Sequence, residues 1–364
     1  MKLPQRTSLI GQVVEILRGE IASGHWQTRL PGERALADHL QVSRSTLRGA
    51  LEQLHRRGLI ETRRKRHWLR APSSKGRRPV AKSRVIGWLY GEAHEDLLPY
   101  KVRHIDEVRR HLHDAGYALE VHCAPHLHHQ HTHKNLHPMV RLSEANVWIL
   151  TQTPLSVQQW FLEAGSPTLI AGSRHPGISL PAIDFDYRSI SRHAAGLFAS
   201  HGHRRVGFLT PSLKQLLGDR ISLQGFQEGM AAATSPHPEV VLAEHDKSLP
   251  RICSAVEFLV CGKNPVTGIF VSHPNHLLAV ISHLGRLRLR VPQEVSLVAR
   301  QHDTPLDFLV PSIACYEFNH HHYAMRVSQM AVRMIEEGSI RNRQFTLMGH
   351  FITGDSLGRV KRSA

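Results

Sequence analysis

The stretch LPGERALADHLQVSRSTLRGALEQLHRRGLIETRR, residues 30–64, decides the fold of the first part of the chain. Its apolar positions recur at three- and four-residue steps, which predicts a short helix over residues 33–40 and a longer one over residues 44–57. Ser43 is suited to cap the second helix, and Gly58 is suited to end it. Two short helices joined by a tight turn predict a helix-turn-helix.

The flanking residues complete a small domain. Ser8 precedes an amphipathic helix that ends at Ser23-Gly24. On the other side, residues 59–62 and 67–70 read as two strands around the basic tip 63–66, which predicts a β-wing. We therefore expect a winged helix-turn-helix over residues 1–70.

Polar and basic side chains gather where this domain would meet DNA. The second helix of a helix-turn-helix enters the major groove by its N-terminal end, where arginine can pair with guanine and hydroxyl groups suit phosphates. The expected DNA-binding residues are Arg34, Ser43, Arg44, Ser45, Thr46, Arg48, Arg64, Lys65, Arg66 and His67.

The charge distribution agrees with a nucleic-acid partner. The chain carries a formal charge of +16, and residues 1–82 hold 18 Lys and Arg against 6 Asp and Glu. Such a local excess favours phosphate binding through counterion release.

Residues 30–64 resemble the winged helix of the GntR family of bacterial repressors. The resemblance implies DNA contacts at Arg34, Arg44, Thr46 and Arg48, with the wing in the minor groove. The wing departs from the family, which commonly has a Gly-x-Gly tip where this chain has Arg64, Arg66 and His67.

The rest of the chain has a different pattern. Residues 71–83, APSSKGRRPVAKS, lack apolar periodicity and predict a basic flexible linker. Apolar strand-like runs then alternate with helical segments over residues 84–364, which predicts βαβ units and parallel sheets. The runs are VIGWLY (85–90), ALEVHC (118–123), NVWILT (146–151), TLIAG (168–172), RVGFLT (205–210), VTGIFV (266–271) and VSLVAR (295–300). A segment of this length suits two lobes facing a cleft.

This second part resembles the ligand-binding domain of the LacI/GalR repressors, which shares the periplasmic-binding-protein fold. The resemblance rests on residues 182–210, 220–230 and 267–316, and most specifically on the phrases GHRRVGFL and RVPQEVSLV. It implies a carbohydrate effector, a homodimer and repression of transcription.

The candidate effector-binding residues follow predicted strands or start helices. They are Gln152, Arg174, Asp186, Arg220, His273 and Asp303. His273-Pro274 stands where the family normally has Asn-Asp, whose Asp grips sugar hydroxyls, so a constitutive DNA-binding regulator with a degenerate pocket stays an alternative.

The chain has 29 histidines, many of them in HCAPHLHHQHTHKNLHP (122–138), while His320-His321-His322 is expected to open a later helix. Imidazole clusters bind zinc, nickel or copper, which leaves a metal-responsive regulator as a second alternative. The segment 122–138 reads as a loop, and no residue is assigned as a metal ligand. We expect no cofactor.

Other functional classes find little support. The four cysteines are far apart and include no CxxC pair, which favours thiols in a reducing compartment. Neither a signal peptide nor an uninterrupted apolar run of membrane-spanning length is present, so a cytoplasmic protein without a membrane partner is expected. GxSxG, HExxH, Walker and GxGxxG motifs are missing, which argues against an enzyme. The sequence thus predicts a regulator that binds operator DNA and responds to a small molecule.

Overall fold

The computed structural model describes most of the chain, in two compact units. The described residues are 9–22, 26, 29–56, 59–63, 66–69, 84–93, 97, 99–124, 127, 133–214, 216–233, 238–338, 340 and 344–360. Residues 1–83 and 129–145 form the first unit, and residues 84–128 and 146–364 form the second. The expected linker, residues 71–83, lies outside the described residues.

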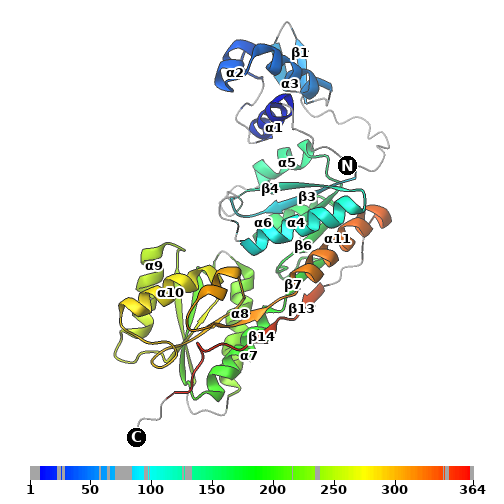
Figure 1. Cartoon of the computed structure of the whole chain (residues 1–364). Coiled ribbons are helices and arrows are strands. Elements are labelled where there is room, and N and C mark those ends of the chain that lie inside the picture. Colours follow the sequence, from blue (N-terminus) through cyan, green and yellow to red (C-terminus); the bar gives the residue numbers. More distant parts are fainter. Residues whose placement is uncertain are drawn as a thin grey trace, which may run out of the picture. The chain divides into compact units, whose positions relative to one another are not determined.

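Three helices and a two-stranded hairpin make up the N-terminal part of the first unit. They are α1 (Leu9–Ala22), α2 (Glu33–His39), α3 (Arg44–Arg56), β1 (Ile60–Arg63) and β2 (Arg66–Leu69). Their apolar faces meet in a small core that includes Leu17, Leu36 and Leu47, which are fully or almost fully buried. β1 pairs antiparallel with β2. This is the winged helix-turn-helix that the periodicity predicts, with element bounds within one residue of those expected for the helices (Figure 1).

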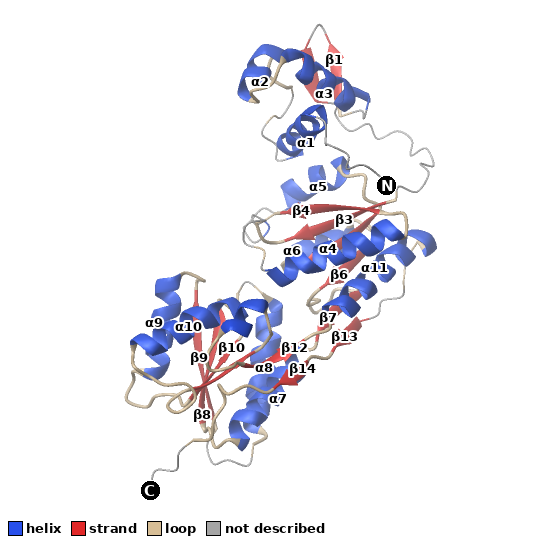
Figure 2. Ribbon diagram, in the orientation of Figure 1, coloured by secondary structure: helices blue, strands red, loops and turns tan. Residues whose placement is uncertain are grey.

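The first sheet of the second unit is wholly parallel. Its strand order is β13 (Gln344–Leu347), β7 (Ala182–Phe185), β6 (Thr168–Ala171), β5 (Val147–Thr151), β3 (Val85–Tyr90) and β4 (Ala118–Cys123). The helices α4 (Pro99–Asp114) and α11 (His320–Glu337) lie side by side along one face of this sheet (Figure 2).

The second sheet is parallel except for one edge strand, β14, which runs antiparallel to β12. Its order is β14 (His350–Ile352), β12 (Ala314–Glu317), β11 (Ser296–Ala299), β10 (Gly268–Val271), β8 (Arg205–Pro211) and β9 (Glu239–His245). The remaining helices of this unit are α6 (Leu155–Glu163), α7 (Tyr187–Ser200), α8 (Leu217–Ala231), α9 (Leu249–Val260), α10 (Pro274–Arg286) and the short 3-10 helix η3 (Thr304–Phe308).

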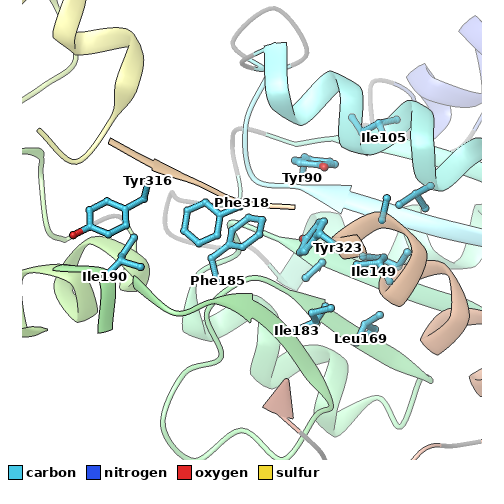
Figure 3. Close-up of a cluster of buried hydrophobic side chains, with 14 of the residues drawn as sticks. Tyr90, Ile105, Ile149, Leu169, Ile183, Phe185, Ile190, Tyr316, Phe318 and Tyr323 are labelled. Atoms are coloured by element: carbon cyan, nitrogen blue, oxygen red, sulfur yellow. The ribbon is translucent and has the colours of Figure 1, made fainter. Parts of the chain in front are cut away.

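The two sheets belong to two lobes that the chain joins three times. It passes from the first sheet to the second after β7, returns after β12, and passes again between β13 and β14. Aromatic side chains fill the region of these crossings: the ring of Phe185 lies 4.2 Å from Phe318 and 4.9 Å from Tyr323, measured between centroids (Figure 3). The crossings therefore pass through one continuous apolar cluster.

The expected fold class, a winged helix-turn-helix followed by two lobes with parallel sheets, is confirmed. The seven quoted runs all contain strands. Part of the expected loop 122–138 is helical, because α5 (His133–Leu142) begins at His133; the other residues between 125 and 132, except Leu127, are not described. Among the described ranges, every helix is too short or too polar to cross a bilayer.

Candidate effector pocket and nucleic-acid interface

Three hydroxyl groups meet at the N-terminal end of α3. The Ser43 Oγ accepts a hydrogen bond from the backbone N–H of Thr46 at 3.1 Å, so Ser43 caps the helix. The same oxygen lies 2.8 Å from Ser45 Oγ and 2.7 Å from Thr46 Oγ1. The free backbone N–H groups and hydroxyls at this end form a surface that suits phosphate oxygens.

Arginines stand around this end of the helix. Arg34, Arg44 and Arg48 are all exposed. Arg48 donates its Nε–H to Glu33 Oε2 at 2.8 Å, and this hydrogen bond lowers the pKa of Glu33. His67 Nε2 lies 3.5 Å from Glu33 Oε1. Glu33, which the sequence analysis did not single out, thus links the wing and α3 to the start of α2.

The expected wing contacts are only partly described. Arg64 and Lys65 lie outside the described residues, and for Arg66 the structure describes the backbone alone. His67 is half-buried, and its carbonyl accepts a hydrogen bond from Leu30 N at 2.9 Å. The hairpin itself is therefore anchored to the segment that precedes α2.

A pocket opens between the two lobes of the second unit, at the carboxyl ends of their strands. It encloses about 850 Å³ of space, counted with the open solvent at its mouth. Five aromatic side chains contribute to its wall: Tyr90, Tyr100, Phe185, Tyr187 and Tyr323. Such a lining, with several aromatic side chains and a few convergent polar groups, is typical of a site for a small organic ligand.

A buried ion pair forms the polar side of the pocket. Arg300, directly after β11, donates Nη1–H to Asp219 Oδ1 at 2.7 Å, and His273 Nε2 lies 3.1 Å from Asp219 Oδ2. Burial alone would raise the pKa of Asp219, but His273 and Arg300 hold it well below its usual range. Burial lowers the pKa of His273, and the neighbouring Asp219 carboxylate opposes this shift.

One donor of this pair has no partner within the described chain. Arg300 Nε is buried and makes no hydrogen bond there, although its guanidinium lies over the Tyr187 ring at 4.3 Å from the centroid. Buried donors are nearly always satisfied in folded proteins. An oxygen atom of a ligand would satisfy this one.

The first lobe adds a second charged group. Lys101 of α4 forms an ion pair with Glu92 and donates to Gln152 Oε1 at 3.0 Å. Asp184, at the end of β7, accepts from Ser173 Oγ at 2.6 Å, and burial raises its pKa to about 6. The pocket therefore presents donors and acceptors from both lobes.

The structure brings only some of the expected effector-binding residues together. Gln152 and His273 line the pocket. Arg174 instead donates to Leu180 O and Gln344 Oε1, and Arg220 is exposed outside the lining. Asp186 caps α7 by accepting from Ser189 N at 2.9 Å.

Asp303 is also outside the pocket lining, buried at the start of η3. It accepts from Thr304 N at 2.9 Å and lies 3.5 Å from Arg103 Nη2. The lining residues that the sequence analysis did not single out include Asp219 and Arg300. Arg300 ends the quoted run VSLVAR. Its position directly after a predicted strand was the feature of the sequence that could have marked it as a pocket residue.

Two family models match separate parts of the chain. Residues 9–69 match the family model of bacterial regulatory proteins of the gntR family, and residues 195–357 match that of the periplasmic binding protein-like domain. A catabolite control protein A from Priestia megaterium is 22% identical over 132 residues, which are 36% of this chain and 40% of that protein. The chain thus aligns with less than half of this relative.

Solved structures show the same fold. A transcriptional regulator CelR–cellobiose complex has a TM-score of 0.67 at 18% identity, covering 97% of this chain and all of that one. A LacI regulator from Bacillus cereus subsp. cytotoxis NVH 391-98 has a TM-score of 0.65 at 19% identity, covering 75% of this chain and 98% of that one. Residues 9–69 thus match a gntR-type DNA-binding domain and residues 195–357 match a periplasmic binding protein-like domain, and the solved LacI regulator shares the fold of the second part.

Proposed function

We propose that this protein is a transcriptional regulator that binds operator DNA as a homodimer. It represses transcription from that operator under the control of a small carbohydrate. It acts by binding, without a catalytic step or a cofactor, in the cytoplasm. The gntR-family match and the hydroxyl and arginine cluster at the start of α3 support the DNA-binding half.

The buried pair of Asp219 and Arg300 is the observation that carries the sensing half. A carboxylate beside a guanidinium offers an acceptor and a donor to neighbouring hydroxyl groups, and the aromatic wall offers faces for the apolar side of a sugar ring. The likeness to the regulator solved with cellobiose supports the same class of ligand. We assign ligand contacts to Gln152, His273, Asp219 and Arg300.

The proposed mechanism uses the position of the pocket between the lobes. A ligand that contacts both lobes favours the closed arrangement, because it gains contacts there that it lacks in the open one. In a dimer, closure changes the spacing of the two winged helices and so the fit to two half-sites. Repression would then be relieved when the sugar binds.

Two experiments test the two halves separately. DNA selected from a random pool by the full-length protein should converge on a pseudo-palindromic site, and a pool that stays random would contradict specific DNA binding. A thermal-shift screen against a panel of mono- and disaccharides should give at least one stabilising sugar. If no sugar of the panel raises the melting temperature while the selected DNA still converges on one site, a constitutive regulator with a degenerate pocket would be favoured.

A further inference from the structure

Three side chains with metal-ligating atoms meet where α11 begins against α4. Glu107 and His111 are four residues apart on α4 and therefore share one face of the helix. His321 is the second residue of α11. One ligand atom from each of the three lies within 4.8 Å of the others, and His321 Nδ1 is 3.4 Å from Glu107 Oε2.

Two of these side chains each have a buried polar atom without a hydrogen bond. Glu107 Oε2 and His111 Nε2 have almost no accessible surface, and neither makes a hydrogen bond within the part of the chain that the structure describes. Polar atoms in that state are rare in folded proteins and call for an explanation such as a missing ion. The two atoms belong to the same three-residue group.

We propose that Glu107, His111 and His321 form a binding site for a divalent transition-metal ion of the zinc class. Two imidazole nitrogens and one carboxylate oxygen are donors that Zn²⁺, Ni²⁺ and Co²⁺ accept, whereas Ca²⁺ and Mg²⁺ prefer oxygen ligands alone. The three residues lie outside the effector pocket, and only His321 belongs to the histidine-rich segments of the sequence.

The spacing of one pair of ligand atoms suits a tetrahedral ion. With bonds of about 2.0–2.1 Å, two ligand atoms of tetrahedral zinc stand roughly 3.3–3.4 Å apart. The pair of Glu107 Oε2 and His321 Nδ1 already has this separation, at 3.4 Å. The side chain of His321 is 60% exposed, so a water molecule can reach the fourth position.

An ion at this site would fasten α4 to α11 beside the effector pocket. One turn before Glu107 on α4, His104 lines the pocket, and its Nε2 lies 2.6 Å from Nδ1 of His320 on α11. Tyr323, also on α11, lines the pocket as well. The metal would therefore stabilise the arrangement of two helices that carry pocket residues, whatever ligand the pocket takes.

The test is a Co²⁺ titration of the metal-stripped full-length protein, followed by visible absorption and reversed by Zn²⁺. The chain has 29 histidines, which can bind further Co²⁺ ions weakly. The readout is therefore the one Co²⁺ equivalent per chain that binds tightly, and its loss in specific variants. Glu107→Gln, His111→Ala and His321→Ala should each weaken that equivalent at least about tenfold, as loss of a group that holds a metal does. His113→Ala and His322→Ala are matched controls on the same two helices and should titrate like the unmodified protein.

A second readout separates metal loss from misfolding. Zn²⁺ should raise the melting temperature of the unmodified protein and both controls more than that of Glu107→Gln, which preserves the side-chain shape. The proposal is overturned if the three ligand variants keep the tight equivalent, or if the controls lose it as well. In that case any metal is held by other histidines.

Discussion

Arg300 and Asp219 form a buried ion pair in the wall of the effector pocket, although 81 residues separate them in the chain. Their side chains are 7% and 2% exposed, and the Arg300 Nη1 to Asp219 Oδ1 distance is 2.7 Å. A pair of this kind is costly to break, because removing one member leaves the other charge buried.

Replacing Arg300 by Met should therefore destabilise the second unit by about 3–5 kcal/mol. Asp219 would retain only the hydrogen bond with His273. Urea denaturation measures the change in the free energy of unfolding. The double variant Asp219→Asn, Arg300→Met should lose less free energy of unfolding than the two single variants lose together. Strict additivity would show that the two side chains do not stabilise each other.

Replacing Asp184 by Asn should stabilise the protein at neutral pH. Burial raises the pKa of Asp184 from 3.8 to about 6, so the folded state binds a proton more tightly than the unfolded state does. The proton on Asp184 therefore contributes fully to the free energy of unfolding below pH 3.8, and this contribution is lost as the pH rises through about 6. The free energy of unfolding changes by roughly 3 kcal/mol over this range. The amide stays neutral throughout and can keep the contacts with Ser173 and Phe185 N.

The measurement is the melting temperature of both proteins at pH 4.5 and pH 8. The melting temperature of Asp184→Asn should exceed that of the unmodified protein by more at pH 8 than at pH 4.5. An equal difference at both values would mean that Asp184 does not change its protonation state in this range.

Replacing Gly225 by Ala should destabilise the packing of α7 on α8. A Cβ atom there would lie 2.2 Å from the backbone oxygen of Arg188, which cannot move without shifting α7. We expect a loss of about 1–3 kcal/mol, as overpacking of a core usually costs. Gly196→Ala on α7 is the control, because nothing lies within 4 Å of a Cβ atom added there. Its free energy of unfolding should rise by up to about 1 kcal/mol, because alanine has the higher helix propensity. Thermal unfolding that ranks the two variants the other way would contradict this packing.

Replacing Arg44 by Ala should weaken binding to the selected DNA site and leave effector binding intact. Arg44 is exposed at the first position of α3, where a side chain reaches base edges. A lost bidentate contact to a base costs about 1–3 kcal/mol, or roughly 5- to 150-fold in affinity. Fluorescence anisotropy with the selected and a scrambled duplex measures the effect. An equal loss on both duplexes would assign Arg44 to phosphate contacts instead.

The winged helix-turn-helix could be predicted because its information is local. The three- and four-residue spacing of Leu47, Leu51 and Leu54 marks the buried face of α3, and all three are buried. The seven apolar runs likewise marked strands of the two sheets, and all of these strands except the edge strand β4 are mostly buried. Five strands were not singled out. β7, β12, β13 and β14 are only three or four residues long and contain polar residues, and the longer β9, EVVLAEH, carries charged residues that interrupt its apolar pattern.

The pocket depends on the tertiary structure. Asp219 and Arg220 are neighbours in sequence, yet successive residues on a helix point about 100° apart, so Asp219 faces Arg300 while Arg220 faces solvent. Lys101, Asp184 and Arg300 come from elements far apart in the chain and meet because strand ends from both sheets converge on one cleft. By itself, the sequence determined the helices and hairpin of the winged helix-turn-helix and seven strands of the two sheets. Only the order of the strands and the crossings between lobes decided which polar side chains share a site, because those distances depend on contacts between residues remote in sequence.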